Sequence, residues 1–138
     1  MAEKLKVEIV TPYKKILTEE VDEITATGTL GEFGVLPGHA PFLSSLKIGE
    51  LTYKQAGVVS HLALNWGYFE VEEDKVTVLV ETAERSDEID LERAKAALGR
   101  AEEALKKLHP EDKSFRVYEA ALERALIRMQ VAGKTARK

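Results

Sequence analysis

Two groups of residues in this chain are of types that can act as bases or metal ligands. The first group is the three histidines, His39, His61 and His109, and the second is an acidic run over 72–74. The histidines lack the i,i+4 or short-loop spacing of a metal site. The acidic run is followed by Lys75 and has the composition of a solvated hairpin tip rather than of paired catalytic carboxylates or a calcium site. Neither group therefore predicts catalysis.

A glycine-rich segment over 28–41 could cradle a phosphate. It holds four glycines and two prolines but lacks the Lys-Ser/Thr pair of a phosphate-binding loop. It keeps apolar residues at Leu30, Phe33, Val35 and Leu36, which a disordered linker would not hold. We predict a loop of fixed shape between strands, and such loops commonly contact other molecules. We expect His39 to form hydrogen bonds within it.

The length and composition limit the class of protein. With 138 residues and no cysteine, the chain can form one medium domain, or a small domain with an appendage, without disulfides or thiolate metal sites. The N-terminal residues lead straight into a strand pattern, and no segment reaches the ~18 apolar residues of a membrane span. We expect a soluble chain in the cytoplasm.

The charge is divided between two parts of the chain. Residues 1–84 hold fourteen acids and seven lysines, a net charge of −7, whereas residues 85–138 hold ten acids and thirteen bases, a net charge of +3. All seven arginines lie in the second part. Arginine is a good helix former, so this bias fits a helical region. It also fits a surface that meets an acidic protein or a phosphate.

Residues 1–85 read as an antiparallel β-sandwich. Residues 5–10 alternate strictly, and further strand patterns lie at 16–27, 42–54 and 76–80, with turn signals about every ten residues. Over 62–68 the period-two pattern predicts that Leu62, Leu64, Trp66 and Tyr68 share one apolar face, and we place His61 on the strand surface. About 84 residues hold eight or more such strands.

Residues 86–138 read as an antiparallel two-helix hairpin. Apolar residues recur at spacings of three and four from Leu91 to Leu108, after a candidate N-cap at Asp90. His109-Pro110 ends this helix, and Ser114 is the candidate cap of a second one that ends at Gly133. Both apolar stripes are thin and rich in alanine, so they bury little area. We expect a hairpin that can dock and undock.

Three stretches carry a resemblance to the epsilon subunits of bacterial F-type ATP synthases. They are Gly-Glu-Phe-Gly-Val-Leu-Pro-Gly-His-Ala-Pro over 31–41, Ile-Asp-Leu-Glu-Arg-Ala over 89–94, and Asn-Trp-Gly-Tyr-Phe-Glu-Val over 65–71. The family commonly has a Gly-Gly pair in the third stretch, and Trp66 occupies the first of those two positions. The resemblance covers essentially the whole chain and includes the order of its two parts.

The resemblance implies a non-catalytic rotor subunit. In this family the sandwich binds the gamma subunit and sits on the ring of c subunits, and the hairpin extends into the catalytic alpha/beta head to inhibit ATP hydrolysis. Glu32 matches the glutamate beside the c-ring, and His39 matches the histidine beside gamma. The complex would hold the chain at the cytoplasmic face of the membrane as a peripheral subunit.

The resemblance also implies a regulatory nucleotide site. In members whose epsilon subunit binds ATP, a motif of the form Ile/Leu-Asp-x-x-Arg-Ala contributes, and Asp90 and Arg93 match it here. Arg124 and Arg128 match the arginines of the second helix, and Glu84 matches a further contact. Asp90 as a cap and Arg93 in local ion pairs is the alternative interpretation. No cofactor is required by this assignment, and ATP would be a regulatory ligand.

Two other function classes stay open from the residues alone. One is a free-standing β-sandwich that binds a small ligand and carries a helical tail, although Trp66 and Tyr68 are expected on an apolar face rather than in an exposed aromatic cluster. The other is an enzyme that uses sandwich carboxylates, for which no convergent motif exists. Neither class would co-purify with a gamma-type subunit.

Overall fold

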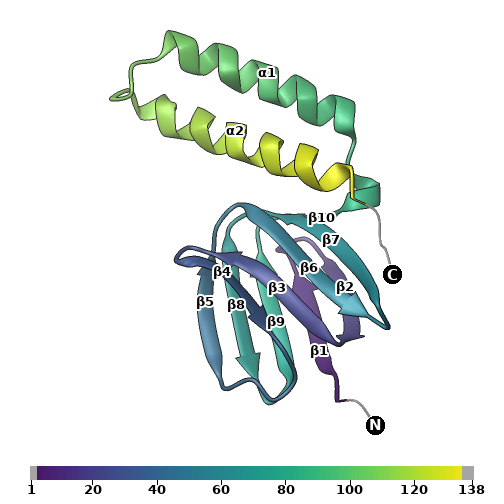
Figure 1. Ribbon diagram of the computed structural model, residues 1–138. Helices are drawn as coiled ribbons and strands as arrows, with labels where there is room; N and C mark the ends of the chain where they lie inside the picture. The colour runs from purple at the N-terminus through teal and green to yellow at the C-terminus, as the bar shows by residue number, and fades with distance from the viewer. Residues whose placement is uncertain (1–2, 135–138) are drawn as a thin grey trace.

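A computed structural model describes residues 3–134 as a β-sandwich with a two-helix hairpin at one end (Figure 1). The fold class predicted from the sequence is confirmed. The elements are β1 Leu5–Val10, β2 Lys15–Val21, β3 Glu23–Gly28, β4 Gly31–Val35, β5 Phe42–Leu46, β6 Gly49–Gln55, β7 Val58–Leu64, β8 Gly67–Glu72, β9 Lys75–Val80, β10 Ala83–Arg85, a 3₁₀ turn η1 Ser86–Glu88, α1 Leu91–Lys107 and α2 Lys113–Ala132.

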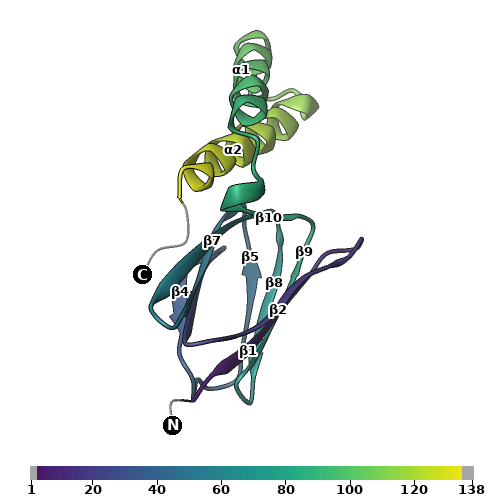
Figure 2. The same cartoon turned by 90° about the vertical axis from the view of Figure 1, so that its right-hand side faces the viewer.

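The strands form one continuous hydrogen-bonded sheet, which folds over to make the two layers of the sandwich. Its order is β10-β7-β6-β3-β5-β8-β9-β1-β2, and β4 pairs with β3 outside this path. Figure 2 views the two layers from the side, with β4 and β7 in one layer and β1, β2, β8 and β9 in the other. All pairs are antiparallel except β1 with β9, which run parallel. The expected antiparallel sandwich therefore has one parallel contact.

The core lies between the two layers and takes alternate residues from the strands. In β1 the inward positions Leu5, Val7 and Ile9 are fully buried, as strict alternation predicts. Phe69 is the largest fully buried side chain, and the Phe33 ring meets it edge-on with centroids 4.8 Å apart. This core is complete within the strands, so it does not depend on the helices for its apolar contacts.

The glycine-rich segment is half strand rather than one loop. Residues 31–35 form β4, which pairs with β3 through a tight turn at Thr29-Leu30. Val35 is buried and Phe33 packs on the core, but Leu30 and Leu36 are exposed, which corrects their expected burial. Leu30 is exposed because it stands at the tip of the β3–β4 hairpin.

The expected apolar face over 62–68 is also wrong. Strand β7 ends at Leu64 and β8 begins at Gly67, and the connection turns the following side chains outward, so Trp66 and Tyr68 are 48% and 58% exposed. Gly67 approaches β9 so closely that an added Cβ atom would lie 1.9 Å from the Leu79 carbonyl oxygen. A change of strand, which a period-two pattern does not record, separates Leu64 from Trp66.

The two helices pack on each other, and α2 is the one that lies on the sandwich (Figure 1). Helix α1 begins at the predicted N-cap, since the Asp90 carboxylate accepts a hydrogen bond from Arg93 N at 3.1 Å. Helix α2 begins at Lys113, one residue before the predicted cap Ser114, because the chain enters it through Asp112. The Asp112 carboxylate accepts from His109 N at 2.9 Å and thereby closes the interhelical turn.

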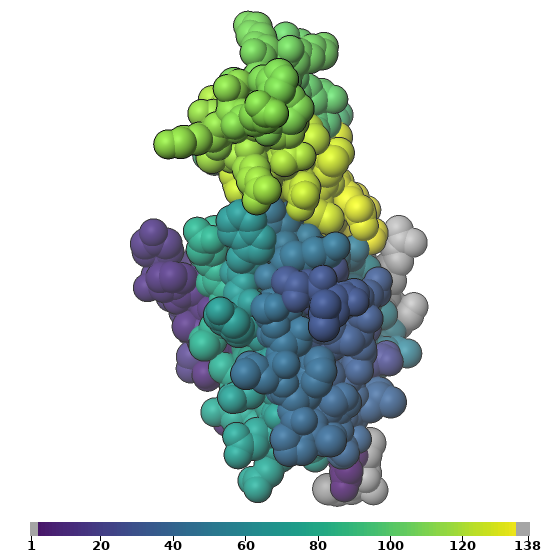
Figure 3. Space-filling model, turned by 90° about the vertical axis from the view of Figure 1, so that its left-hand side faces the viewer, coloured from purple at the N-terminus to yellow at the C-terminus, as the bar shows by residue number. Residues whose placement is uncertain are grey.

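Little of the hairpin is buried. Its buried residues are the small side chains of Ala94, Ala101, Ala125 and Val131. In the space-filling view, the helices form a separate lobe at one end of the sandwich (Figure 3). The junction between this lobe and the sandwich holds most of the residues predicted to have a functional role.

Candidate functional site

The first cluster at this junction joins Glu84 to Arg128. Strand β10 places Glu84 opposite Ala63 of β7, and its carboxylate faces α2. Arg128 Nη2 donates to Glu84 Oε2 at 3.2 Å, and Arg128 Nε lies 2.8 Å from Oε1 as an ion pair that is not aligned for a hydrogen bond. Both side chains are largely shielded from water, which strengthens their attraction.

Arg124 lies one turn earlier on the same face of α2 and shares a cleft with this pair. The cleft has a volume of about 490 Å³ and is lined by Glu84, Arg124 and Arg128 together with Asn65 and residues of β2, α1 and α2. No carboxylate among residues 3–134 lies within ion-pairing distance of Arg124. Its guanidinium is therefore available to an anion that enters the cleft.

Asp90 and Arg93 are not part of this cleft. The Asp90 carboxylate is occupied as the N-cap of α1, and Arg93 is exposed on the first turn of that helix. Neither residue lines the cleft around Arg124. The structure thus brings together three of the five predicted nucleotide residues and leaves the other two at the start of α1.

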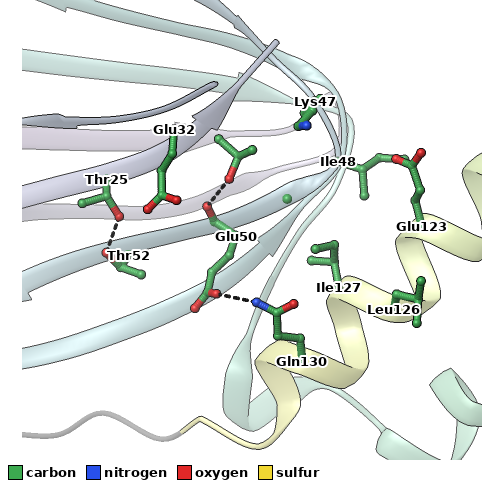
Figure 4. Close-up of a pocket in the computed structure, with 12 residues that line it drawn as sticks. Thr25, Glu32, Lys47, Ile48, Glu50, Thr52, Glu123, Leu126, Ile127 and Gln130 are labelled. Atoms are coloured by element: carbon green, nitrogen blue, oxygen red, sulfur yellow. Dashed lines mark hydrogen bonds between the residues drawn. The ribbon is translucent and has the colours of Figure 1, made fainter. Parts of the chain in front are cut away.

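Glu32 lies at the mouth of a second cleft, between the sandwich and α2. This cleft has a volume of about 490 Å³ and runs between the β3–β6 face and the side of α2 that faces the sandwich (Figure 4). Glu32 is exposed on β4, and Glu50 and Glu123 approach the same space from β6 and α2. The cleft is acidic, with Lys47 as the base on its rim.

His39 lies in the turn after β4, away from the helices. Its Nδ1 donates to the Ala40 carbonyl oxygen at 2.6 Å, and its ring contacts Phe42 edge-on at 5.6 Å. Asp74 from the β8–β9 turn accepts from Gly38 N at 2.7 Å and fixes the shape of this turn. The local hydrogen bond expected of His39 is confirmed, and one residue of the acidic run over 72–74 has a structural role.

The sequence did not indicate a cluster around Glu50. Its carboxylate lies 2.5 Å from His61 Nδ1 and 2.8 Å from Lys134 Nζ, and it accepts from Gln130 Nε2 at 3.3 Å. His61 was expected on an open strand surface, but its side chain is only 18% exposed because α2 covers this face. The register of the β6–β7 hairpin was a usable signal, since it places Glu50 and His61 on one face as diagonal neighbours.

The Glu50 carboxyl is more acidic than an ordinary glutamate. Burial alone would raise its pKa, but hydrogen bonds from Lys134 and His61 outweigh burial and lower it. The docked helix therefore favours the ionised carboxylate.

A short strip of exposed apolar side chains crosses the outer face of β5, β8 and β9, where the exposed Glu70 lies opposite Leu43. Leu43, Tyr68 and Leu79 lie on neighbouring strands of this face, and Trp66 immediately precedes β8. An exposed apolar strip of this kind is typical of a protein-binding surface.

Comparison with known families matches residues 4–133 of the chain. A model of the ATP synthase delta/epsilon chain β-sandwich domain matches residues 4–86, and a model of the long α-helix domain of the same chains matches residues 87–133. This chain belongs to the ATP synthase delta/epsilon family. The resemblance noted in the three sequence stretches is thereby confirmed.

Proteins with sequences very similar to this chain are ATP synthase epsilon chains of bacteria. The ATP synthase epsilon chain of Geotalea daltonii is 88% identical, and that of Geobacter sulfurreducens is 86% identical, each over 138 residues and the full length of both chains. Among solved structures, a chain of the Euglena gracilis mitochondrial ATP synthase (OSCP/F1/c-ring) is 26% identical, with a TM-score of 0.81. That match covers 95% of this chain and 82% of the other.

Membership of this family decides between the function classes that the residues left open. The exposure of Trp66 and Tyr68 removes the reason given for setting aside a free-standing binding module. The matches over the whole length nevertheless assign the chain to a component of the ATP synthase complex. Within residues 3–134, neither helix is long and apolar enough to cross a membrane.

Proposed function

We propose that this chain is a rotor subunit of the central stalk, which helps couple the ion gradient to ATP synthesis and inhibits ATP hydrolysis through its hairpin. It would have no catalytic residues of its own and would be held at the cytoplasmic face of the membrane by the complex. The domain over 1–85 would make the rotor contacts, and the hairpin over 86–138 would be the regulatory part.

The observation that carries this proposal is the small apolar contact between hairpin and sandwich. The sandwich has its own core. Within residues 3–134 the hairpin fully buries only four small side chains, and two of them lie on α1, which packs on α2. Helix α2 is also held by ion pairs at Glu84 and Glu50. An interface with little apolar area has a small free energy of docking. Such a hairpin can leave the sandwich without unfolding it and can bind elsewhere.

Exposed side chains support the partner contacts that the resemblance implies. We propose that the gamma subunit binds the strip of Leu43, Tyr68 and Leu79 and the turn that holds His39, which precedes Leu43 in sequence. We propose that Glu32 contacts the c-ring. Single cysteines at Glu32 and His39 should crosslink to c and gamma respectively, since the chain has no other cysteine. Loss of both crosslinks in an intact complex would contradict these contacts.

We further propose that ATP binds the docked hairpin at Arg124 and Arg128. Arg124 and Arg128 lie one helical turn apart in one cleft, and two guanidinium groups suit a polyphosphate, although Arg128 would share its charge with Glu84. Arg124→Ala with Arg128→Ala should weaken ATP binding to the isolated chain by roughly 1.5–3 kcal/mol for each lost charge-assisted contact. Unchanged titration by ATP in the double variant would exclude these two residues from the site.

Deletion of residues 86–138 tests the regulatory role. We expect the complex to assemble and to synthesise ATP, because the sandwich keeps its core and its exposed strip. ATP hydrolysis by membrane vesicles should rise because the inhibitory hairpin is missing. A hydrolysis rate equal to that of the full-length complex would show that the hairpin is not a brake in this enzyme.

A further inference from the structure

The C-terminal end of α2 is attached to the sandwich at one carboxylate. Glu50 Oε1 accepts from Gln130 Nε2 at 3.3 Å (Figure 4). The same oxygen accepts from Lys134 Nζ at 2.8 Å. Glu50 Oε2 lies 2.5 Å from His61 Nδ1 on the neighbouring strand. The two carboxylate oxygens therefore have different partners: Oε2 is bound by a residue of the sheet, and Oε1 is bound by residues at the end of α2.

His61 orients the carboxylate for the helix. Glu50 has several rotatable bonds, and a free side chain would point to water through the open cleft lined by Glu32 and Glu123. The hydrogen bond from His61 holds one oxygen against β7, so that the other faces α2. The Glu50 side chain is only 15% exposed between the sheet and α2.

The charges around this contact favour it. From α2 come the Lys134 ammonium and the Gln130 amide, and from β7 comes His61, all of which donate to Glu50. The neighbouring acids Glu32 and Glu123 line the same cleft but form no ion pair with this group. Lys134 and Lys47 on the rim are therefore the bases that offset these acids.

We propose that Glu50 is a clasp that holds the end of α2 on the sandwich, with His61 as its positioning residue, and that this clasp controls how often the hairpin leaves. The apolar contact of the hairpin is small, so one partly buried ion pair is a large share of the docking free energy. The consequence for ATP hydrolysis rests on the proposed function, but docking itself can be measured on the chain alone.

The experiment follows the distance between hairpin and sandwich. Nitroxide labels at Thr18→Cys on β2 and Glu102→Cys on α1 use exposed positions in a chain without cysteine. Pulsed electron resonance across a urea series reports the urea concentration at which half of the hairpins are undocked. Glu123→Gln is the matched control because it removes a charge from the same cleft without touching the clasp.

Glu50→Gln and Lys134→Met should each lower the ratio of docked to undocked hairpin about tenfold, and the double variant should be no worse than either one. His61→Ala should lower the ratio, and His61→Gln should restore part of it because an amide can donate to the same oxygen. The loss from His61→Ala should vanish when Glu50 is already Gln. Midpoints for Glu50→Gln that equal those of Glu123→Gln would overturn the clasp, as would full additivity of the Glu50 and Lys134 changes.

A second readout separates the clasp from the proposed brake. If the released hairpin is inhibitory, the complex with Glu50→Gln should hydrolyse ATP more slowly than the wild-type complex. Release of the hairpin with no change in hydrolysis would support the clasp and contradict the inhibitory role.

Discussion

Gly67 is the position where a single methyl group should disturb the fold most. An added Cβ atom would lie 1.9 Å from the Leu79 carbonyl oxygen and 2.7 Å from Val80 Cα. Both are backbone atoms of β9, which cannot rotate away as a flexible side chain would. Gly67→Ala therefore requires β8 and β9 to separate at Gly67↔Val80 and Tyr68↔Leu79, the pairs nearest to the clash.

The cost can be estimated from its parts. Overpacking in a well-packed region costs about 1–3 kcal/mol. Strained or broken hydrogen bonds between the strands add about 1 kcal/mol each. The lower entropy of alanine in the unfolded chain offsets about 0.4–1 kcal/mol of this loss. We expect Gly67→Ala to lower the free energy of unfolding by about 2–3 kcal/mol.

Urea unfolding of the isolated chain measures this loss. Far-ultraviolet circular dichroism and the fluorescence of the single tryptophan, Trp66, monitor the transition. Gly34→Ala in β4 is the matched control, because the nearest atom to its added Cβ is Thr25 Cγ2 at an ordinary 3.7 Å. The control should stay within about 0.5 kcal/mol of the wild type. A Gly67→Ala variant as stable as Gly34→Ala would show that β8 and β9 accommodate the added methyl group.

Three further predictions concern the helix cap, the clasp and the exposed strip. Asp90→Ala should cost about 1 kcal/mol of hairpin stability by removing the N-cap, measured as faster amide exchange in the first turn of α1. The pKa of Glu50 is lower in the folded chain than its ordinary 4.5, so its stabilisation is complete above that pH and is lost as the pH falls through the folded pKa. Unfolding between pH 3 and 6 should therefore depend less on pH in Glu50→Gln than in the wild type, and equal slopes would contradict this. Tyr68→Ser and Leu43→Ser should each weaken binding of a purified gamma subunit about tenfold in calorimetry, whereas exposed Thr18→Ala should not.

Local patterns predicted the elements because side-chain spacing follows backbone geometry. Strict alternation placed β1, and spacings of three and four placed both helices. Asp90 was predicted as a cap because capping joins residues three positions apart. The same reasoning was wrong for Trp66 and Tyr68, since their exposure depends on where β7 ends and on how closely β8 approaches β9.

Residue patterns and the resemblance that they carry were enough to predict the fold class and the family, and to propose residues that bind a nucleotide or a partner. Which of these residues meet depends on the tertiary structure. Arg128 reaches Glu84 across 44 positions of sequence, and Lys134 reaches Glu50 across 84. No periodic pattern records such contacts, because they arise only when α2 packs on the folded sandwich. The docked hairpin therefore depends on charge pairs between residues that become neighbours only after both parts have folded.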